Sequence, residues 1–264
     1  MVYGAKERRM RRIFRSDGRT LIVAMDHAGA MGPVPGLEDP GRVIEQVLAG
    51  GADVIMTTYG VATRFTEAIG GAGLILRVDG GTSMLPEERG SMSLIYDAID
   101  ALRVGADGVV CMGFPGSEFE SETLPYLAGL VSQCREWALP VLAEMLPGGF
   151  ENPAKWWTAE NIAFACRLGA EMGVDFVKTR YTGDVESFRR VVEATYVPIV
   201  VLGGGKTKTV EDLLGTVYDA MQAGAKGVAI GRNIYQYPEP QKMTAALAAI
   251  IHDGATPEAA GKLL

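Results

Sequence analysis

Short apolar runs recur along the chain, and each is followed by a polar or glycine-rich segment and then by a stretch with helical periodicity. Most runs are rich in Val, Ile and Leu with few charges, which is typical of strands buried on both faces of a parallel sheet. The expected strands cover Thr20–His27, Ala52–Thr58, Leu74–Gly80, Gly108–Gly113, Pro140–Leu146, Phe176–Tyr181, Pro198–Gly204 and Gly227–Asn233. Eight strands that alternate with helices favour a closed, parallel (β/α)8 TIM barrel.

Amphipathic stretches between these runs predict the helices, and Asp39 is placed to cap the first of them. The expected helices cover Pro40–Ala49, Ser91–Val104, Glu118–Trp137, Thr158–Met172, Asp184–Ala194, Thr209–Ala223 and Gln241–His252. Several end in a Gly-Ala or Met-Gly element directly before the next strand, where glycine supplies a left-handed cap. With no linker or compositional break, residues 1–264 are expected to form one domain.

Composition and charge narrow the function. Hydrophobic residues make up 48% and charged residues 22%, so a large core can form, and the net charge of −7 argues against a nucleic-acid partner. No apolar run reaches the ~18 residues of a membrane span. The odd cysteine count, 3, without CxxC spacing fits reduced thiols and a cytoplasmic location. The basic N-terminal segment is expected to be a short helical extension that covers the barrel floor or meets a neighbouring subunit.

Lys178 is the most informative residue, because it lies within the sixth expected strand rather than on a helix surface. Burial generally lowers the pKa of a lysine amine, which frees it to attack a carbonyl. The alternative is a structural ion pair with Asp26 or Glu144. Arg180 has the same strand parity, so it is expected either to depress the pKa of the amine further or to hold an anion.

Other polar residues at strand ends are candidates for proton transfer. Asp26 could carry a proton or orient substrate hydroxyls, although it could also simply cap the next turn. His27 is one of 2 histidines, and His252 lies on the last expected helix, so no histidine-rich metal site can form. We therefore expect neither a metal nor a cofactor.

Glycine-rich loops follow the seventh and eighth strands, where α/β barrels commonly bind phosphate through backbone N–H groups. The expected phosphate-binding residues are Gly203, Gly204, Gly205, Lys206, Gly231 and Arg232. The alternative is that these glycines only make tight turns.

These segments together resemble the archaeal-type class I fructose-bisphosphate aldolases and related Schiff-base aldolases, including 2-amino-3,7-dideoxy-D-threo-hept-6-ulosonate synthase. The matching stretches, in the family's order, are Met25-Asp26-His27-Ala28, the run from Phe176 to Asp184, Gly203–Thr207 and Gly227–Gln236. The resemblance implies a Schiff-base lysine at Lys178, an aspartate at Asp26, a substrate phosphate on the glycine loops, and a homo-oligomer, commonly a decamer.

Two departures from the family pattern affect the expected chemistry. Leu146 stands where these aldolases usually carry a proton-transferring tyrosine, so the role falls to another group; Tyr181, Tyr59, His27 and Glu144 are the candidates. Arg77 and Asp79 add unexpected charge on the third strand and, with Arg180 and Tyr59, are predicted to contact the substrate. The pair Trp156-Trp157 either covers the site or packs a subunit interface.

The predicted function is that of a metal-independent class I aldolase in carbohydrate metabolism. Lys178 would form an iminium with a phosphorylated ketose, and Asp26 or Glu144 would take the proton of the departing hydroxyl. A transaldolase-like enzyme or an acyl-transferring, thiolase-like relative could use the same lysine. A barrel that only binds or isomerises a phosphorylated metabolite would make no Schiff base.

Overall fold

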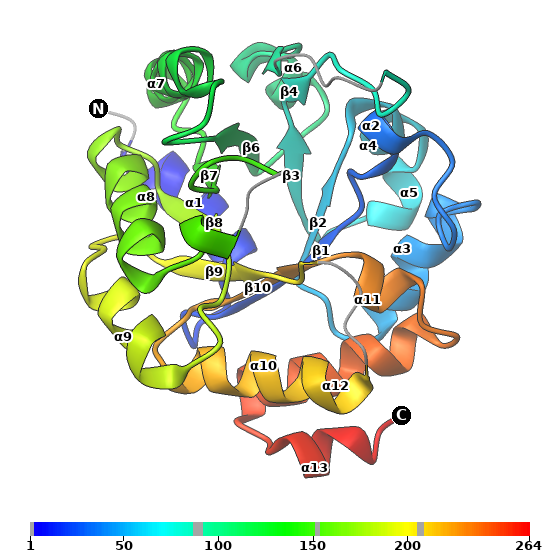
Figure 1. The fold of residues 1–264 in the computed structure, drawn as a ribbon. Helices are drawn as coiled ribbons and strands as arrows, with labels where there is room; N and C mark the ends of the chain where they lie inside the picture. Colours follow the sequence, from blue (N-terminus) through cyan, green and yellow to red (C-terminus); the bar gives the residue numbers. More distant parts are fainter. Residues whose placement is uncertain (1–2, 87–91, 151–153, 205–208) are drawn as a thin grey trace.

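The strands of the chain close into a barrel. The computed structural model describes residues 3–86, 92–150, 154–204 and 209–264. Within these ranges eight parallel strands pair in the order β1-β10-β9-β8-β7-β6-β3-β2, and β2 returns to β1 (Figure 1). They are β1 (Thr20–Ala24), β2 (Val54–Thr57), β3 (Gly73–Arg77), β6 (Gly108–Gly113), β7 (Val141–Met145), β8 (Phe176–Thr179), β9 (Ile199–Leu202) and β10 (Gly227–Ile230). The predicted (β/α)8 barrel is confirmed, and every expected strand overlaps an observed one.

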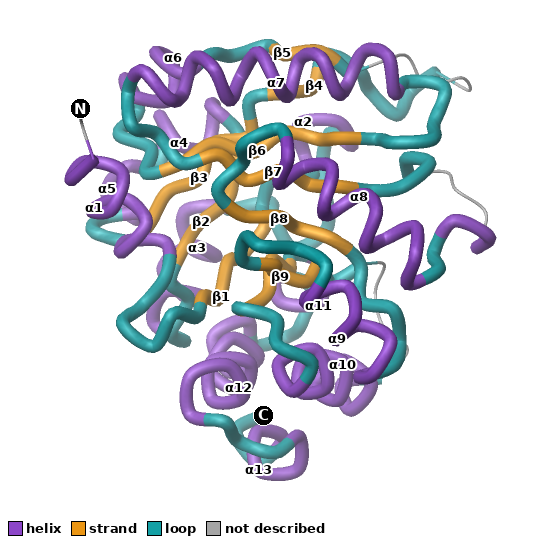
Figure 2. Tube along the Cα trace, turned by 90° about the vertical axis from the view of Figure 1, so that its left-hand side faces the viewer, coloured by secondary structure: helices purple, strands orange, loops and turns teal. Residues whose placement is uncertain are grey.

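Helices surround the strands, most of them where periodicity placed them (Figure 2). The longer ones are α1 (Tyr3–Ile13), α3 (Pro40–Ala49), α7 (Glu120–Glu136), α8 (Ala159–Glu171), α9 (Val185–Glu193), α10 (Val210–Gln222) and α12 (Pro240–Asp253). Shorter ones are α2 (Ala28–Met31), α4 (Tyr59–Arg64), α5 (Thr66–Ile69), α6 (Ala98–Arg103), α11 (Arg232–Tyr235), α13 (Pro257–Gly261) and the 3-10 turn η1 (Ala154–Trp156). Asp39 accepts a hydrogen bond from the Arg42 backbone, which confirms the expected cap.

The helix expected over residues 91–104 is shorter than predicted. Ser93–Leu94 form β5, which pairs antiparallel with β4 (Asp79–Gly80). The backbone N–H groups of Ile95 and Tyr96 donate to the carbonyl of Val78 over 2.9 and 3.1 Å. These amides are therefore bound to the residue that follows β3, and α6 begins only after the capping box at Asp97.

Alternate strand residues build separate cores inside and outside the barrel. The inner core contains Ile22, Ala24, Val54, Met56, Ile75, Val110, Leu142, Phe176, Val200 and Ala229, together with Ile13 of α1. Phe14, just after α1, packs edge-on against Phe176 with ring centroids 5.2 Å apart. The basic N-terminal helix therefore covers the barrel floor, which was one of the expected arrangements.

Aspartates fasten the floor to the N-terminal segment. Asp53, Asp107 and Asp175 each precede a strand, and each accepts a backbone N–H from the start of a neighbouring strand. These bonds come from Leu21 (2.7 Å), Leu74 (3.1 Å) and Val141 (2.9 Å), and the same carboxylates pair with Arg15, Arg12 and Lys6, respectively. None of the helices in the described ranges is long and apolar enough to cross a bilayer.

Candidate active site

Lys178 and Glu144 form the centre of the barrel mouth. They are register partners on β8 and β7, and both occupy inward positions of their strands. Lys178 Nζ lies 2.8 Å from Glu144 Oε1, and both side chains are buried, with 7% and 6% exposed. Phe176 points into the barrel, and Lys178, two residues later on the same strand, points the same way. The strand therefore positions the amine above the apolar core. The expected alternative of an ion pair with Glu144 is therefore present in the structure.

Arg77 connects the carboxylates of the mouth. Its guanidinium donates from Nε to Asp26 Oδ2 over 2.7 Å, from Nη2 to Glu144 Oε2 over 2.6 Å and from Nη1 to Asp79 Oδ1 over 3.1 Å. Asp79 also accepts the Tyr126 hydroxyl at 3.0 Å and a backbone N–H of β6 at 2.7 Å. Arg77 and Asp79 are thus held by buried partners in the mouth, and their contact with the substrate stays a prediction.

Burial and the neighbouring cations Arg77 and Lys178 together set the pKa of each carboxyl group in the mouth. Burial raises the pKa of Asp26, but the charges of Arg77 and Lys178 outweigh it and bring that pKa to about 2. Burial likewise raises the pKa of Glu144, and Lys178 and Arg77 lower it below its ordinary value. For Asp79 burial dominates, and its pKa lies above the ordinary value. Asp26 and Glu144 are therefore ionised at neutral pH and able to accept a proton.

His27 borders this network beside Asp26. Burial lowers the pKa of the imidazole, so the neutral ring predominates at neutral pH. Its Nδ1 lies 3.8 Å from Asp26 Oδ1, too far for a hydrogen bond, and finds no other partner among the described residues. The ring packs edge-on against Tyr235 at 5.8 Å. The Tyr235 hydroxyl is buried and is also without a partner in the described part of the chain.

The two other candidate tyrosines each pack against another aromatic ring. Tyr181 has the opposite strand parity and packs edge-on against Phe188 of α9 at 5.2 Å, outside the barrel. Burial raises its pKa to about 12. Tyr59 stacks on Tyr96 with centroids 4.6 Å apart. Tyr235 is not among the predicted site residues, although it lies within the same matching stretch as Gly231 and Arg232.

The glycine loops lie close together at the ends of β9 and β10. A Cβ on Gly231 would lie 2.2 Å from the Ala24 carbonyl oxygen, and Gly204 has a φ of +62°. Arg232 Nη2 donates to the Gly204 carbonyl over 3.1 Å, while its Nε is buried without a partner among the described residues. Gly203 packs beside Ile230. The predicted Gly205 and Lys206 lie outside the described residues.

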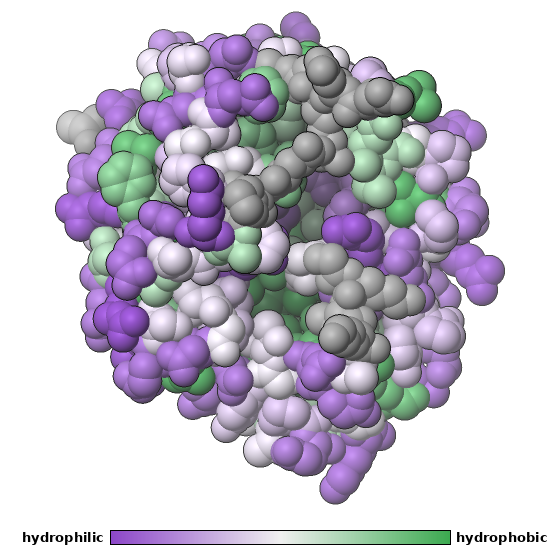
Figure 3. Space-filling model, viewed as in Figure 1, coloured by the Kyte–Doolittle hydropathy of each residue, from purple (hydrophilic) through white to green (hydrophobic). Residues whose placement is uncertain are grey.

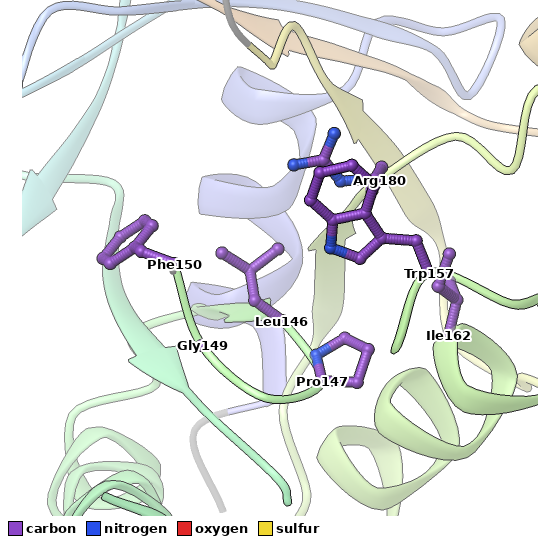
Figure 4. Close-up of a pocket in the computed structure, with 7 residues that line it drawn as sticks. All are labelled: Leu146, Pro147, Gly149, Phe150, Trp157, Ile162 and Arg180. Atoms are coloured by element: carbon purple, nitrogen blue, oxygen red, sulfur yellow. The ribbon is translucent and has the colours of Figure 1, made fainter. Parts of the chain in front are cut away.

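Leu146, at the position expected to differ from the family pattern, forms an apolar wall of the mouth. It is 8% exposed and packs with Met112 and Phe114. On the other side it lines a small cavity with Arg180 and Trp157 (Figure 4). The face carrying the mouth is hollowed near its centre, and hydrophobic atoms are visible within the hollow (Figure 3). In the described ranges, no group of three or more His, Cys, Asp or Glu side chains is arranged to hold a metal ion.

Comparison with known proteins identifies the family. The DeoC/LacD family aldolase matches residues 20–237. The chain belongs to this family. Its relatives include the 2-amino-3,7-dideoxy-D-threo-hept-6-ulosonate synthase of Halobacterium salinarum, 38% identical over 263 residues, with 98% of this chain and 96% of the relative covered. The class 1 fructose-bisphosphate aldolase of Thermoproteus tenax is 32% identical over 249 residues, with 92% and 93% covered.

Solved structures agree with this assignment. An archaeal fructose 1,6-bisphosphate aldolase superposes with a TM-score of 0.86 and 31% identity, with 95% of this chain and 100% of the other covered. Another archaeal aldolase structure, with its catalytic lysine covalently bound to the carbinolamine intermediate, gives a TM-score of 0.85 at 31% identity, with coverage of 94% and 99%. The protein is a class I, Schiff-base-forming aldolase, as the resemblance predicted. The comparisons favour this function over the acyl-transferring and isomerase alternatives.

Proposed function

We propose that Lys178 forms the Schiff base of this aldolase. The observation that carries the proposal is a buried lysine on an inward position of β8, with Nζ 2.8 Å from a carboxylate oxygen of Glu144. A lysine in such a place is positioned by the strand, and its neighbour can remove the proton that prevents attack. The relative with a lysine-bound carbinolamine supports the same chemistry on the same fold.

The reaction begins with transfer of a proton from the ammonium of Lys178 to Glu144. The free amine adds to the ketone carbon, and loss of water from the carbinolamine leaves an iminium ion. The iminium accepts the electron pair of the adjacent C–C bond as that bond breaks, and the departing aldehyde loses its hydroxyl proton to a base. Protonation and hydrolysis of the resulting enamine release the second product and regenerate Lys178. In the synthetic direction the enamine attacks an aldehyde instead, which is also the transaldolase-like variant.

Asp26 and His27 are the proposed groups for the hydroxyl proton. Asp26 is ionised and held by Arg77, and the neutral His27 ring has an unpartnered Nδ1 among the described residues. Leu146 cannot move a proton, so this pair would replace the tyrosine expected on that strand. Glu144 already serves Lys178, and Tyr181 packs outside the barrel.

We propose a phosphorylated ketose, or a related phosphorylated ketone, as the substrate. Glycines at 203, 204 and 231 allow the backbone to approach an oxyanion, and the Arg232 guanidinium lies beside them with an unpartnered Nε in the described part of the chain. The relatives named as fructose-bisphosphate aldolases support a phosphorylated substrate. Gly205 and Lys206 belong to the same proposed phosphate site.

Borohydride trapping tests the assignment of Lys178. Dihydroxyacetone phosphate and a panel of phosphorylated ketoses are incubated with the protein, reduced, and mapped by peptide mass spectrometry. We expect an adduct on Lys178 and none in Lys178→Met. Lys226→Met is the matched control, because this lysine is exposed on the barrel floor. Full activity of Lys178→Met in folded protein would remove the proposal.

We further propose that the protein is a cytoplasmic homo-oligomer, a decamer by family resemblance, with one barrel domain per chain. The cysteines Cys111, Cys134 and Cys166 are buried free thiols, which fits a reducing compartment. Phe164 of α8 is 64% exposed, and Tyr196, which stacks with Arg167, is 61% exposed, so both rings are available to a neighbouring subunit. Light scattering of the wild type and of Phe164→Glu measures the oligomeric state; the variant is expected to dissociate.

A further inference from the structure

Tyr235 is the last residue of α11, the short helix that follows β10 next to the end of β1 (Figure 1). The residue is 2% exposed, yet its hydroxyl has no hydrogen-bond partner among the described residues. A buried hydroxyl without a partner lowers the stability of a protein, whereas a phenylalanine of nearly the same shape carries no such cost. The hydroxyl is therefore available to a group that enters the site with the substrate.

Two rings beside Gly231 turn their polar ends toward one small region of the mouth. Gly231 follows the inward Ala229 by two residues, and a Cβ on it would lie 2.6 Å from His27 Cε1 and 3.1 Å from Tyr235 Cε1. His27 Cε1 is bonded to both ring nitrogens, and Tyr235 Cε1 is bonded to the carbon that carries the hydroxyl. The polar ends of both rings therefore lie around the space that the glycine leaves open.

Charged groups of the proposed reaction site act on both rings. The charges of Arg232 and Asp26 reach the Tyr235 hydroxyl. The charges of Asp26 and Lys178 reach the His27 imidazole in the same way. Burial raises the pKa of Tyr235 well above its ordinary value, so the hydroxyl keeps its proton and serves as a hydrogen-bond donor.

We infer that Tyr235 is a further catalytic residue, whose hydroxyl donates a hydrogen bond to the reacting oxygen of the aldehyde partner, beside His27. Because His27 and Asp26 are the proposed acceptors of the hydroxyl proton, an oxygen bound beside them is the one that reacts. In cleavage this oxygen loses its proton to one of these acceptors and becomes the carbonyl oxygen of the departing aldehyde. In synthesis it gains negative charge as the enamine attacks. A fixed donor stabilises that charge in both directions, and Tyr235 keeps its own proton throughout.

This inference rests on the proposed role of Lys178, and three tyrosine-to-phenylalanine variants test it in the whole enzyme. Tyr235→Phe removes the unpartnered hydroxyl, whereas Tyr126→Phe removes one that donates to Asp79 over 3.0 Å. Tyr218→Phe, half-buried on the outer helix α10, is the control for activity. Cleavage of fructose 1,6-bisphosphate and of fructose 1-phosphate gives kcat. Borohydride trapping with dihydroxyacetone phosphate reports the Schiff base, and thermal unfolding reports stability.

We expect Tyr235→Phe to lower kcat roughly 100-fold, the usual effect of removing one donor to a developing oxyanion. The adduct with dihydroxyacetone phosphate should be unchanged, because that ketone forms a Schiff base without a C–C bond step. The thermal midpoint of Tyr235→Phe should equal or exceed that of the wild type, since the hydroxyl has no partner in the described part of the chain. Tyr126→Phe should lower the midpoint, because Asp79 loses a donor. Tyr218→Phe should leave turnover unchanged.

Unchanged turnover in Tyr235→Phe would overturn the inference. A lower thermal midpoint in this variant would do the same, because the hydroxyl would then have a partner within the protein. Loss of the dihydroxyacetone phosphate adduct would also overturn it, because the hydroxyl would then bind the ketone half of the substrate. If the wild type cleaves the ketoses but forms no adduct, the Lys178 proposal fails. A loss of turnover in Tyr235→Phe would still support the inference in that case, and unchanged turnover would still overturn it.

Discussion

Carboxylates lie at both the floor and the mouth of the barrel, but their hydrogen-bond partners differ between the two ends. At the floor, Asp53, Asp107 and Asp175 each accept a backbone N–H, and their cationic partners are partly exposed; the Arg12 side chain, for example, is 51% exposed. At the mouth, Asp26 and Glu144 bind the side chain of Arg77, which is 8% exposed. A carboxylate that accepts backbone N–H groups holds neighbouring strands together. A carboxylate that is paired with side-chain cations can instead exchange a proton with a bound substrate.

Replacement of Arg77 should lower the stability of the protein more than any other substitution at the mouth. Arg77→Met leaves Asp26, Asp79 and Glu144 buried without their shared cation, and breaking a buried ion pair in this way typically destabilises by about 3–5 kcal/mol. We expect a loss of this size in urea unfolding and almost no turnover. Arg103→Met is the control, since Arg103 forms an exposed pair with Asp100 and should change stability by less than about 0.5 kcal/mol. A stable Arg77→Met protein would show that the carboxylates do not depend on Arg77.

Glu144→Gln should abolish proton transfer and also weaken the mouth. The amide oxygen can still accept from Arg77, but the side chain can no longer take a proton from Lys178. We expect kcat to fall roughly 100- to 10,000-fold, the usual contribution of a general base, and the thermal midpoint to fall as well, because the buried Lys178 loses its carboxylate partner. Steady-state kinetics and thermal unfolding measure both quantities. Glu136→Gln, on the exposed surface of α7, is the matched control. Normal turnover in Glu144→Gln would assign the proton to another group.

The inward alternation of strand residues made much of this site predictable. It places Lys178, Glu144 and Arg77 inside the mouth, because successive side chains of a strand point to opposite faces. The same rule places Tyr181 outside, so parity already argued against it as a candidate. The pairing of Arg77 with three carboxylates could not be predicted from the sequence. These partners come from different parts of the chain and meet only when the barrel closes.

Contacts formed by loops were still less predictable. Trp157 and Arg180 are separated by 23 positions, and their stacking depends on the path of the loop between β7 and α8. The sequence therefore does not decide whether the tryptophan pair covers the site or packs a subunit interface. The pairing of β4 with β5 was also not predictable, because these strands are only two residues long and pair only with each other.

Asp107→Ala should test the floor without affecting the mouth. The substitution removes the acceptor of the Leu74 amide, and an unsatisfied buried amide costs about 1–3 kcal/mol. The pair with Arg12, whose side chain is 51% exposed, should add less than the lost amide bond. We expect this loss in urea unfolding with unchanged kcat. Asp107→Asn keeps an acceptor oxygen, so it should lose less stability; an equal loss in both variants would attribute the effect to charge instead.

His252 offers the smallest and most specific test of the floor. Its ring nitrogens lie 2.7 Å from Asp17 Oδ2 and 3.0 Å from Asp53 Oδ2. Burial lowers the pKa of His252, but the hydrogen bonds to Asp53 and Asp17 outweigh it and raise the pKa above its ordinary value. Because the folded pKa exceeds the unfolded one, the stabilisation is complete below about pH 6.5 and is lost as the pH rises through the folded pKa.

We expect the free energy of unfolding of the wild type to decline over this window relative to His252→Gln, by less than about 1 kcal/mol, since Asp17 is partly exposed. Urea titrations between about pH 5.5 and 8.5 measure the difference between the two proteins. A difference that does not vary with pH would mean that the ring bridges these aspartates without changing its charge over this window.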